Sequence, residues 1–347
     1  KKTLTRRTNQ GGVDELSYNK LALCTGARGR QVKLPGCELN GIHYLRDLAD
    51  AESIKSKIAE GQRAVIVGGG YIGLEIGTAF RKLGSAVTIV EAENRILPLY
   101  DIKLTAPVSK SLKALGIEVL TGTTAQGLGD TGLIVSTDGV ETELPADKIL
   151  VTVGRRPRSD SANMSALDLD TDGPFIAIDA RCQTSMQGVF AIGDVTGEPM
   201  LAHRAMAQGE MVAELIAGHA RTWDKACIPA VCFTDPEIVS AGLSPDEAKV
   251  QGVDVITGTF PFAANGRAMT MEAETGFVRV VAHKDSHVIL GVQAVGAGIA
   301  ELSASFSTAI EMGARLEDLS AIVHAHPTQS EALQEAALAG LGQALHI

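Results

Sequence analysis

A short Gly-rich loop between an apolar strand and an amphipathic helix constrains the fold of this chain most. Residues 63–67 (RAVIV) form an apolar run of strand type, and apolar residues recur with helical spacing over 72–83. Gly84 stands where a left-handed stop belongs, and a second strand over 86–90 ends in Glu91. The loop itself consists of Gly68, Gly69, Gly70, Tyr71, Ile72 and Gly73. This order of strand, G-x-G-x-x-G, helix, strand and acid predicts a βαβ unit that binds a dinucleotide.

Each position of this unit has a physical task. Gly68 permits a tight turn, Gly70 lets the backbone approach a pyrophosphate at the helix N-terminus, and Gly73 lets the helix lie close to the strand. Glu91 can accept hydrogen bonds from a ribose diol and would repel a 2′-phosphate. The pattern therefore favours NAD over NADP, although Arg95 close by leaves that preference open.

Composition places the chain among α/β proteins with more than one domain. Its 347 residues are enough for two or three domains. Apolar residues make up 45% and aromatic residues 4%, which is typical of sheets filled by Val, Ile and Ala. The net charge of −10 argues against nucleic acid or an anionic membrane as a partner. No stretch approaches the roughly 20 apolar residues of a transmembrane helix.

The cysteines indicate a reducing, cytoplasmic environment and no metal site. The five are Cys24, Cys37, Cys182, Cys227 and Cys232, an odd and sparse set. Cys227 and Cys232 have the C-x4-C spacing of some redox-active disulfides, but residues 230–233 (AVCF) read as a strand. Five extended positions span about 16 Å, whereas a disulfide tolerates a Cα separation of about 7 Å at most. We predict a reduced, structural pair.

Residues 324–331, HAHPTQSE, combine two histidines with a carboxylate. Thr328 followed three residues later by Glu331 fits a capping box, in which each side chain satisfies a backbone N–H of the other residue. That interpretation leaves His326 unexplained. A histidine held beside a carboxylate is also how a general base is built.

In two further segments, a predicted strand leads into a Gly-containing turn. Residues 18–26 (YNKLALCTG) end in Gly26, and the strand that begins at 189 (VFAIGD) ends in Asp194. Taken alone, both could be ordinary turns. Together with residues 151–157 (VTVGRRP), which contain Gly154, they resemble the pyridine nucleotide-disulfide oxidoreductase family. The resemblance implies that the TG and GD motifs touch FAD, with Asp194 on the ribitol and Ala202 near the phosphate side through its backbone.

Within that family, HAHPTQSE is similar to the signature of dihydrolipoamide dehydrogenases. The likeness extends over 64–347 and is greatest to the enzymes of branched-chain 2-oxo-acid dehydrogenase complexes. It implies oxidation of protein-bound dihydrolipoamide, with electrons passing through a cysteine disulfide to FAD and then to NAD. His326 would take the thiol proton, and Glu331 would orient the imidazole. Pro327 would follow a cis bond, and His324 would be a structural neighbour.

The resemblance also implies a domain order and partners. We expect a two-dinucleotide-binding α/β fold with a partial FAD domain at 1–40 and 158–225, an NAD domain at 41–157 and an α+β interface domain at 226–347. In the family the interface domain pairs two subunits, and the base of one chain completes the active site of the other. A homodimer that serves a lipoyl-bearing acyltransferase is therefore expected.

The sequence departs from the family pattern at its start. Family members open with a first G-x-G-x-x-G and a C-x4-C redox pair, and neither occurs here, nor does the lysine expected to pair with Glu75. Cys227 and Cys232 fall at the entry to the interface domain and cannot substitute. We expect this chain, as given, to bind FAD poorly or not at all and to lack lipoamide turnover.

Two alternative functions remain open at this point. Residues 18–30 and 41–54 are more similar to ferredoxin reductases of ring-hydroxylating oxygenase systems, so the chain reads as a mosaic. Such reductases have no use for the His326 and Glu331 pair, which places them second. The third alternative is a non-catalytic fragment that only binds nucleotide or dimerises.

Overall fold

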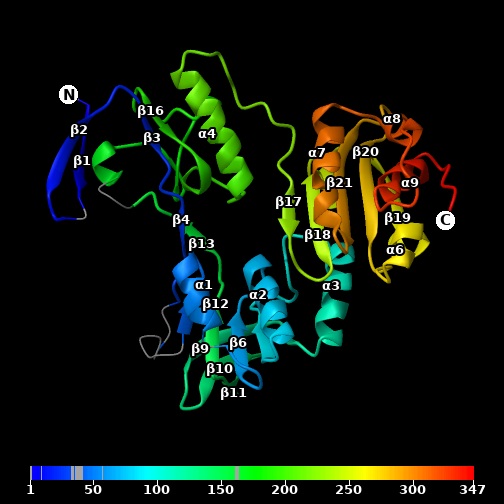
Figure 1. The fold of residues 1–347 in the computed structure, drawn as a ribbon, viewed down its shortest axis with the longest axis horizontal. Coiled ribbons are helices and arrows are strands. Elements are labelled where there is room, and N and C mark those ends of the chain that lie inside the picture. Colours follow the sequence, from blue (N-terminus) through cyan, green and yellow to red (C-terminus); the bar gives the residue numbers. More distant parts are fainter. Residues whose placement is uncertain (1, 9, 33–34, 36–41, 57, 161–163) are drawn as a thin grey trace. The chain divides into compact units, whose positions relative to one another are not determined.

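The computed structural model describes residues 2–8, 10–32, 35, 42–56, 58–160 and 164–347. The chain divides into two compact units, one of residues 1–28 with 155–225 and the other of residues 29–154 with 226–347. Figure 1 labels many of the elements of both. The division into three domains stays a prediction, and its proposed boundary near residue 40 falls outside the described residues, as does Cys37.

The first unit is built around two short parallel strands and one long helix. Strand β3 (Leu21–Leu23) pairs with β16 (Val189–Ala191), and helix α4 (Ala202–Ile216) packs nearby. Smaller elements complete the unit: the hairpin β1 (Thr3–Arg7) and β2 (Val13–Ser17), the pairs β4 (Ala27–Gly29) with β13 (Arg155–Pro157) and β14 (Thr171–Asp172) with β15 (Phe175–Ile176), and the 3-10 turns η1 (Met164–Leu167) and η2 (Gly193–Val195). The predicted strands before both turns are confirmed.

The second unit contains a five-stranded parallel sheet in the order β5-β12-β6-β7-β8. Its strands are β5 (Ile42–Tyr44), β12 (Lys148–Val151), β6 (Arg63–Val67), β7 (Ala86–Val90) and β8 (Glu118–Leu120). Alternate side chains of β6 face opposite ways, so Ile66 packs on the helical side and Val65 on the other. A sheet buried on both faces explains why these strands read as continuous apolar runs.

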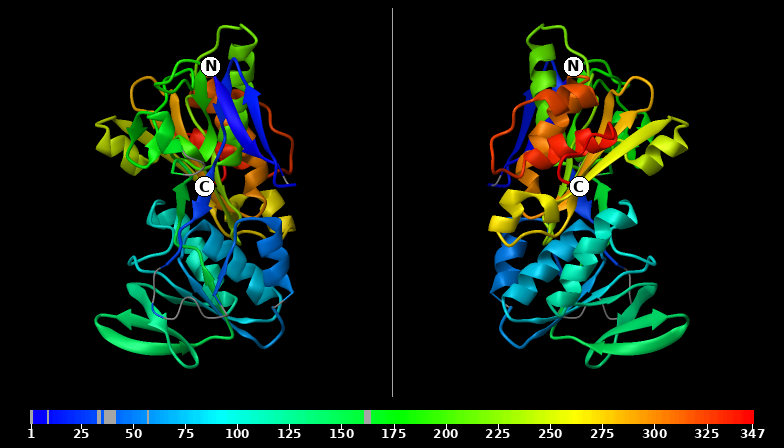
Figure 2. Two further views of the ribbon diagram at one scale, coloured as in Figure 1. Left: turned by 90° about the vertical axis from the view of Figure 1, so that its left-hand side faces the viewer. Right: turned by 90° about the vertical axis from the view of Figure 1, so that its right-hand side faces the viewer.

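Different layers cover the two faces of this parallel sheet. Helices α1 (Leu48–Lys55), α2 (Tyr71–Lys82) and α3 (Ile102–Ala114) share a core with one face. The antiparallel strands β9 (Thr123–Leu128), β10 (Gly132–Thr137) and β11 (Val140–Pro145) pack on the other through Leu133 and Val135. Figure 2 shows this three-stranded ribbon beside the parallel sheet. The predicted strand, helix and strand around the Gly-rich loop are confirmed.

The same unit carries a second five-stranded sheet in the order β17-β18-β21-β20-β19. Its strands are β17 (Ala230–Cys232), β18 (Glu237–Gly242), β21 (Ile289–Gly296), β20 (Phe277–His283) and β19 (Val255–Pro261). Helices α7 (Ser303–Glu311), α8 (Leu316–Ala321) and α9 (Glu331–Gly340) bury apolar side chains against it. The remaining elements are α5 (Pro245–Val250), α6 (Gly266–Thr270), η3 (Phe262–Ala264) and η4 (Ile299–Leu302). Cys232, Ile238 and Val295 of this sheet join the core of the nucleotide-type sheet, so the two sheets share a buried apolar contact.

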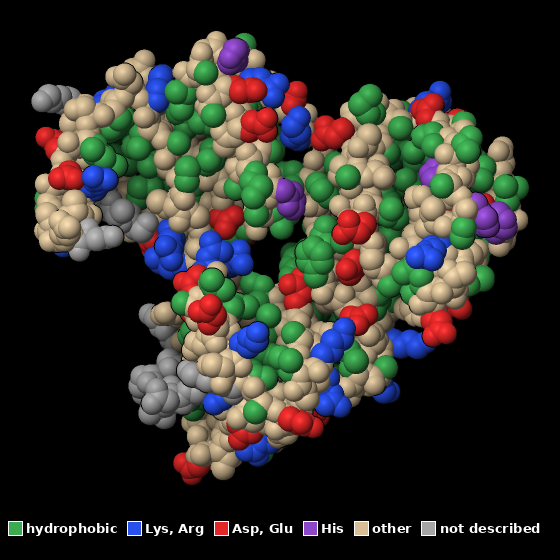
Figure 3. All heavy atoms as spheres, in the orientation of Figure 1, with side chains coloured by type: hydrophobic (Ala, Val, Ile, Leu, Met, Phe, Trp, Pro, Cys, Tyr) green, Lys and Arg blue, Asp and Glu red, His purple; other side chains and the backbone are tan. Residues whose placement is uncertain are grey.

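The spread of charged side chains and the character of the helices are consistent with the composition of the chain. Figure 3 shows Lys and Arg side chains scattered among Asp and Glu on the face it displays. None of the helices in the described ranges is both long and apolar enough to cross a membrane. The mixed α/β architecture predicted from the sequence is confirmed.

Candidate functional site

Two glycines of the loop after β6 are required by the backbone itself. Gly68 has φ +111°, and a Cβ there would lie 2.7 Å from the carbonyl oxygen of Thr152. At Gly73, inside α2, a Cβ would lie 1.9 Å from the carbonyl oxygen of Gly68. No side chain fits either position, because real Cβ atoms do not approach backbone oxygen so closely. The tight turn and the close approach of helix to strand are thus both present.

Gly70 differs from these two because it faces open space. It is the N-cap residue of α2, and a Cβ placed on it would meet no atom within 4 Å. Tyr71 and Ile72 form the first turn of this 12-residue helix, which has no side-chain cap. A helix N-terminus without a side-chain cap, next to empty space, favours an anionic group such as a pyrophosphate. The residues present therefore fit the phosphate portion of NAD.

Glu91 braces the Gly-rich loop from the end of β7. It is buried, and its Oε2 accepts the N–H of Gly69 at 2.6 Å while its Oε1 accepts the N–H of Glu93 at 2.8 Å. Each carboxylate oxygen keeps a further lone pair, so these bonds leave capacity for a ribose hydroxyl. The side chain lies where the sequence pattern requires it, and ribose binding stays a prediction.

Arg95, which left the choice of nucleotide open, is engaged within its own loop. Its guanidinium donates to the carbonyl oxygens of Tyr100 and Pro98. These bonds occupy the fork of donors that would otherwise suit a 2′-phosphate. The geometry thereby supports the preference for NAD that Glu91 suggests.

The segment after β12 lies beside the Gly-rich loop. Gly154 has φ +98°, and its carbonyl oxygen accepts the N–H of Arg30 at 2.9 Å. Thr152 was missed by the sequence analysis, yet its Oγ1 donates to the carbonyl oxygen of Val67 at 3.0 Å. Its position was the available signal, because it follows a parallel strand next to β6 and must emerge at the same edge.

In the first unit, the TG and GD motifs emerge at one edge. Leu23 pairs with Ala191 in the parallel strands, so Gly26 and Asp194 both follow carboxyl ends of neighbouring strands. Gly26 has φ +67°. The N–H of Gly193 donates to the buried Oε1 of Gln208 at 2.8 Å, which fixes the turn that carries Asp194. Ligands of parallel α/β sheets bind at such an edge.

Ala202 is the first residue of α4 and is exposed, and this helix has no side-chain cap. Arg204, two residues further, donates to the carbonyl oxygen of Gly197 at 2.8 Å. A carboxylate at a strand end beside an uncapped helix N-terminus suits a ligand that has both hydroxyl and phosphate groups. The residues present fit this part of FAD, and their contacts with it stay a prediction.

The histidine and the carboxylate near the carboxyl end are in contact. The Nδ1 atom of His326 lies 2.9 Å from Oε1 of Glu331, and the two side chains are 76% and 23% exposed. The peptide bond between His326 and Pro327 is cis, as expected. Nδ1 of His324 lies 2.9 Å from the carbonyl oxygen of Ile322 and takes no part in this pair.

The capping box predicted for Thr328 and Glu331 is only half right. Oε2 of Glu331 does accept the N–H of Thr328 at 2.7 Å. The hydroxyl of Thr328, however, donates to the carbonyl oxygen of Ala325 at 2.7 Å, and the N-cap of α9 is Ser330. The prediction was wrong because the helix begins at Glu331 itself, two residues later than the box requires.

The surroundings of Glu331 keep it ionised. Partial burial opposes ionisation, but the Thr328 N–H and the His326 imidazole outweigh it and hold the pKa of Glu331 below its ordinary value. An ionised carboxylate at Oε1 requires a proton on Nδ1 of His326. The tautomer that results leaves the Nε2 lone pair directed away from Glu331.

The described cysteines carry free thiols. These are Cys24, Cys182, Cys227 and Cys232. Cys232 lies in β17, and burial raises its pKa to about 12. Burial also raises the pKa of Cys227. The two thiols are not joined to each other, and a raised pKa disfavours the thiolate in both, which agrees with the predicted reduced, structural pair.

Glu75 of α2 has a backbone partner. Its Oε1 accepts the N–H of Phe233 at 2.9 Å, and burial raises its pKa. This bond joins the nucleotide-type helix to the end of β17. The sequence indicated only that the lysine expected from the family resemblance is missing, and it gave no sign of this bond.

Known proteins resemble this chain over most of its length. A family pattern described as "Pyridine nucleotide-disulphide oxidoreductase" matches residues 1–209, and its dimerisation domain matches residues 228–337. A dihydrolipoyl dehydrogenase of Pseudomonas aeruginosa is 53% identical over 97% of this chain and 71% of its own length. Dihydrolipoyl dehydrogenase 2 of Haloarcula marismortui is 43% identical over 96% of this chain and 71% of its own length.

Solved structures share the fold. LpdA from Mycobacterium tuberculosis superposes with a TM-score of 0.85 at 24% identity, over 96% of this chain and 72% of its own. The HOCl-induced flavoprotein disulfide reductase RclA from Escherichia coli gives 0.83 at 23% identity, over 97% of this chain and 76% of its own. At these identities the structures support the architecture alone.

Proposed function

Because this chain belongs to the pyridine nucleotide-disulphide oxidoreductase family, we propose that it oxidises dihydrolipoamide to lipoamide with FAD and NAD. When bound, FAD accepts the electron pair and NAD carries it away as hydride. The chain provides a Gly-rich loop that fits NAD, a strand edge that fits part of FAD, and a histidine paired with a carboxylate.

The contact between His326 and Glu331 carries this proposal. With a proton fixed on Nδ1 by the carboxylate, Nε2 can take the proton of a dihydrolipoyl thiol. Thiol deprotonation is the necessary step, since the thiolate and not the thiol attacks a disulfide. Glu331 then stabilises the imidazolium, as a carboxylate does in a hydrolase triad.

The exposure of His326 favours a site shared between two copies. Its side chain is 76% exposed, and the apolar Val323 nearby is 94% exposed. An imidazole this exposed is accessible to a second copy of the chain. We infer a homodimer in which His326 of one protomer is delivered to the flavin site of the other. The matched dimerisation domain supports this inference.

A lipoyl-bearing acyltransferase of a branched-chain 2-oxo-acid dehydrogenase complex is the proposed partner, and the cytoplasm is the proposed compartment. The ferredoxin reductase and the non-catalytic fragment are not favoured. The similarity to dihydrolipoyl dehydrogenases covers 97% of the chain, including the opening residues that suggested a mosaic. An oxygenase reductase would also leave the His326 and Glu331 pair without a task.

The proposal requires a redox-active disulfide, which Cys227 and Cys232 do not provide. The test therefore uses the protein as its gene encodes it. We expect a yellow protein with flavin absorbance bands and lipoamide-dependent reduction of NAD. A flavoprotein that reduces a ferredoxin but not lipoamide would contradict the proposal. A colourless dimer that binds only nucleotide would instead support the third alternative.

A further inference from the structure

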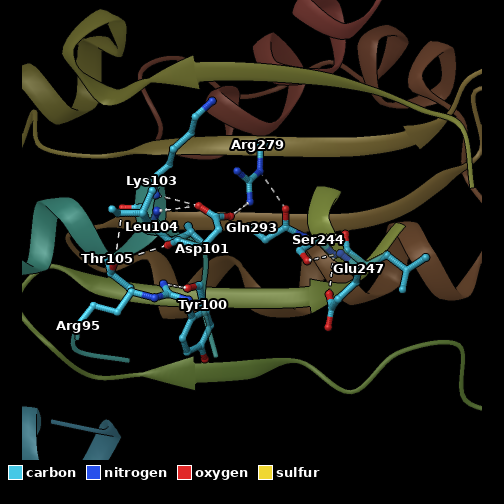
Figure 4. A network of polar contacts seen from close by, with 12 residues as sticks. Arg95, Tyr100, Asp101, Lys103, Leu104, Thr105, Ser244, Glu247, Arg279 and Gln293 are labelled. Carbon is cyan, nitrogen blue, oxygen red and sulfur yellow. Dashed lines mark hydrogen bonds and ion pairs between the residues drawn. The ribbon is translucent and has the colours of Figure 1, made fainter. Parts of the chain in front are cut away.

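A buried ion pair joins the start of helix α3 to the second sheet of the second unit. Arg279 lies in β20, and its guanidinium contacts Oδ2 of Asp101, with the two side chains 7% and 13% exposed. The Nε of Arg279 also donates to Oε1 of Gln293 at 3.0 Å, directly across the ladder between β20 and β21. Figure 4 shows Arg279 reaching from the sheet to Asp101. Because the guanidinium is buried, its positive charge would carry a large free-energy penalty without a carboxylate beside it.

The two oxygens of Asp101 serve different partners. Oδ2 faces Arg279, whereas Oδ1 caps α3 by accepting the N–H groups of Lys103 at 2.9 Å and Leu104 at 3.2 Å. The cap is local to the helix. The ion pair connects that helix start to the second sheet, so the two tasks can be separated by mutation.

Asp101 also ends the loop that supports the nucleotide site. This loop, residues 92–100, starts directly after Glu91. The N–H of Leu97 donates to the carbonyl oxygen of Gly69 at 3.0 Å, and the N–H of Tyr100 donates to the carbonyl oxygen of Leu97 at 2.9 Å. The Tyr100 hydroxyl contacts that of Tyr71 in the Gly-rich loop, with the rings edge to face.

Packing completes the connection. A Cβ on Gly69 would lie 3.2 Å from Cγ2 of the buried Ile96. Ile96, in loop 92–100, therefore packs directly against the Gly-rich loop. The Arg95 bonds to Tyr100 and Pro98 close the loop on itself. The support of the Gly-rich loop is thus fixed at one end by Glu91 and at the other by Asp101.

We propose that Asp101 and Arg279 are positioning residues for dinucleotide binding, which hold loop 92–100 against the Gly-rich loop. Both residues lie outside the G-x-G-x-x-G motif and act through the backbone of loop 92–100. The inference rests on the proposed function only in that the Gly-rich loop binds a dinucleotide.

The test is Asp101→Asn, with ADP-ribose as a redox-inert probe of the nucleotide site in calorimetry. Asn caps helices about as well as Asp, so this variant removes the charge opposite Arg279 and keeps the cap of α3. We expect the Kd for ADP-ribose to rise roughly 3- to 30-fold, the range for contacts that act through a packed network. The KM for NAD should rise by the same factor while kcat is retained.

Two further variants sharpen the result. Arg279→Lys keeps the charge but loses the fork of donors, so its affinity should lie between wild type and Asp101→Asn. Asp147→Asn is the matched control, because Asp147 pairs with Arg63 at the opposite end of β6 with both side chains exposed. This control should bind ADP-ribose as wild type does.

Two outcomes overturn the inference. If Asp101→Asn lowers the melting temperature and leaves the Kd unchanged, the pair is only structural. If the wild-type protein binds no ADP-ribose, the nucleotide site itself is refuted, which separates this failure from the first. Should Asp101→Asn not fold, the double variant Asp101→Asn with Arg279→Met removes both charges and is read in the same way.

Discussion

Nδ1 of His326 lies 2.9 Å from Oε1 of Glu331, whose second oxygen accepts the N–H of Thr328 at 2.7 Å. The backbone bond fixes the carboxylate, and the carboxylate fixes the imidazole. One residue at the start of α9 therefore shapes the turn and sets the tautomer of the proposed base. The capping and the chemical interpretation of Glu331 are compatible, since each uses a different oxygen.

Replacing the proposed base should slow lipoamide turnover severely. We expect His326→Gln to lower kcat by about a hundredfold to ten-thousandfold, the contribution of a positioned general base. Flavin absorbance bands and the affinity for ADP-ribose should stay unchanged, because the proposed task of His326 is to take the thiol proton and not to hold either nucleotide. Steady-state assays with dihydrolipoamide and NAD measure the first effect, and calorimetry measures the second.

His324→Gln is the control for this prediction. His324 lies two residues away, and its Nδ1 contacts the carbonyl oxygen of Ile322 and not Glu331, so the same substitution there should change turnover little. Equal turnover in wild type and His326→Gln would refute the role of His326 as the base.

The same substitution, Gly to Ala, should affect stability very differently at two positions of the Gly-rich loop. Gly73→Ala places a Cβ 1.9 Å from a backbone oxygen and should cost about 3 kcal/mol of unfolding free energy or more. Gly70→Ala meets no atom and should cost within about 1 kcal/mol, the loss of a Gly N-cap. It should nevertheless weaken ADP-ribose binding, because the Cβ enters the space proposed for the pyrophosphate.

Urea unfolding and calorimetry on both variants check this pair of predictions. Each variant serves as the control for the other, since both add one methyl group to the same loop. A Gly70→Ala protein that is stable and binds ADP-ribose with wild-type affinity would exclude this space as the phosphate site.

The nucleotide loop could be predicted from the sequence because all of its constraints are local. Gly68 and Gly73 are forced by backbone contacts within a few residues or with the adjacent strand, and Glu91 ends the next strand in order. A fixed spacing therefore carries the geometry. The contact of His326 with Glu331 was predictable for the same reason, since the two residues lie five positions apart.

The Asp101 and Arg279 pair could not be predicted, because nothing local identifies the partners. Arg279 lies within an apolar strand, Asp101 lies in a loop, and 178 positions separate them. Only the packing of the second sheet on α3 brings them together. The prediction of where α9 starts was wrong for a related reason. The carboxylate of Glu331 also contacts an imidazole, and capping rules do not consider such a contact.

Glu91 should determine the preference between NAD and NADP. Glu91→Gln removes the negative charge that would face a 2′-phosphate, so the preference for NAD in kcat/KM should fall by about tenfold or more. Affinity for both nucleotides should also fall, since an amide accepts only one of the two backbone N–H bonds. Glu93→Gln is the control, because Glu93 is exposed and its side chain is not bonded to the Gly-rich loop. An undiminished preference in Glu91→Gln would assign selectivity to other residues.

The stability contributed by Asp101 should depend on pH in a defined direction. Burial opposes its ionisation, but Arg279 and the N–H groups of α3 prevail and lower its pKa in the folded protein. A carboxyl group with a lowered folded pKa stabilises the protein fully above its unfolded value of about 3.9, and this stability is lost as the pH falls through the folded pKa. At pH 7, Asp101→Asn should therefore be less stable than wild type by about 3 kcal/mol, the lower end for a broken buried pair. Urea unfolding of both proteins from pH 7 downward should show this difference constant to about pH 5 and shrinking below the unfolded pKa. A difference that persists unchanged at the lowest pH would mean that the ionised carboxylate of Asp101 is not what stabilises Arg279.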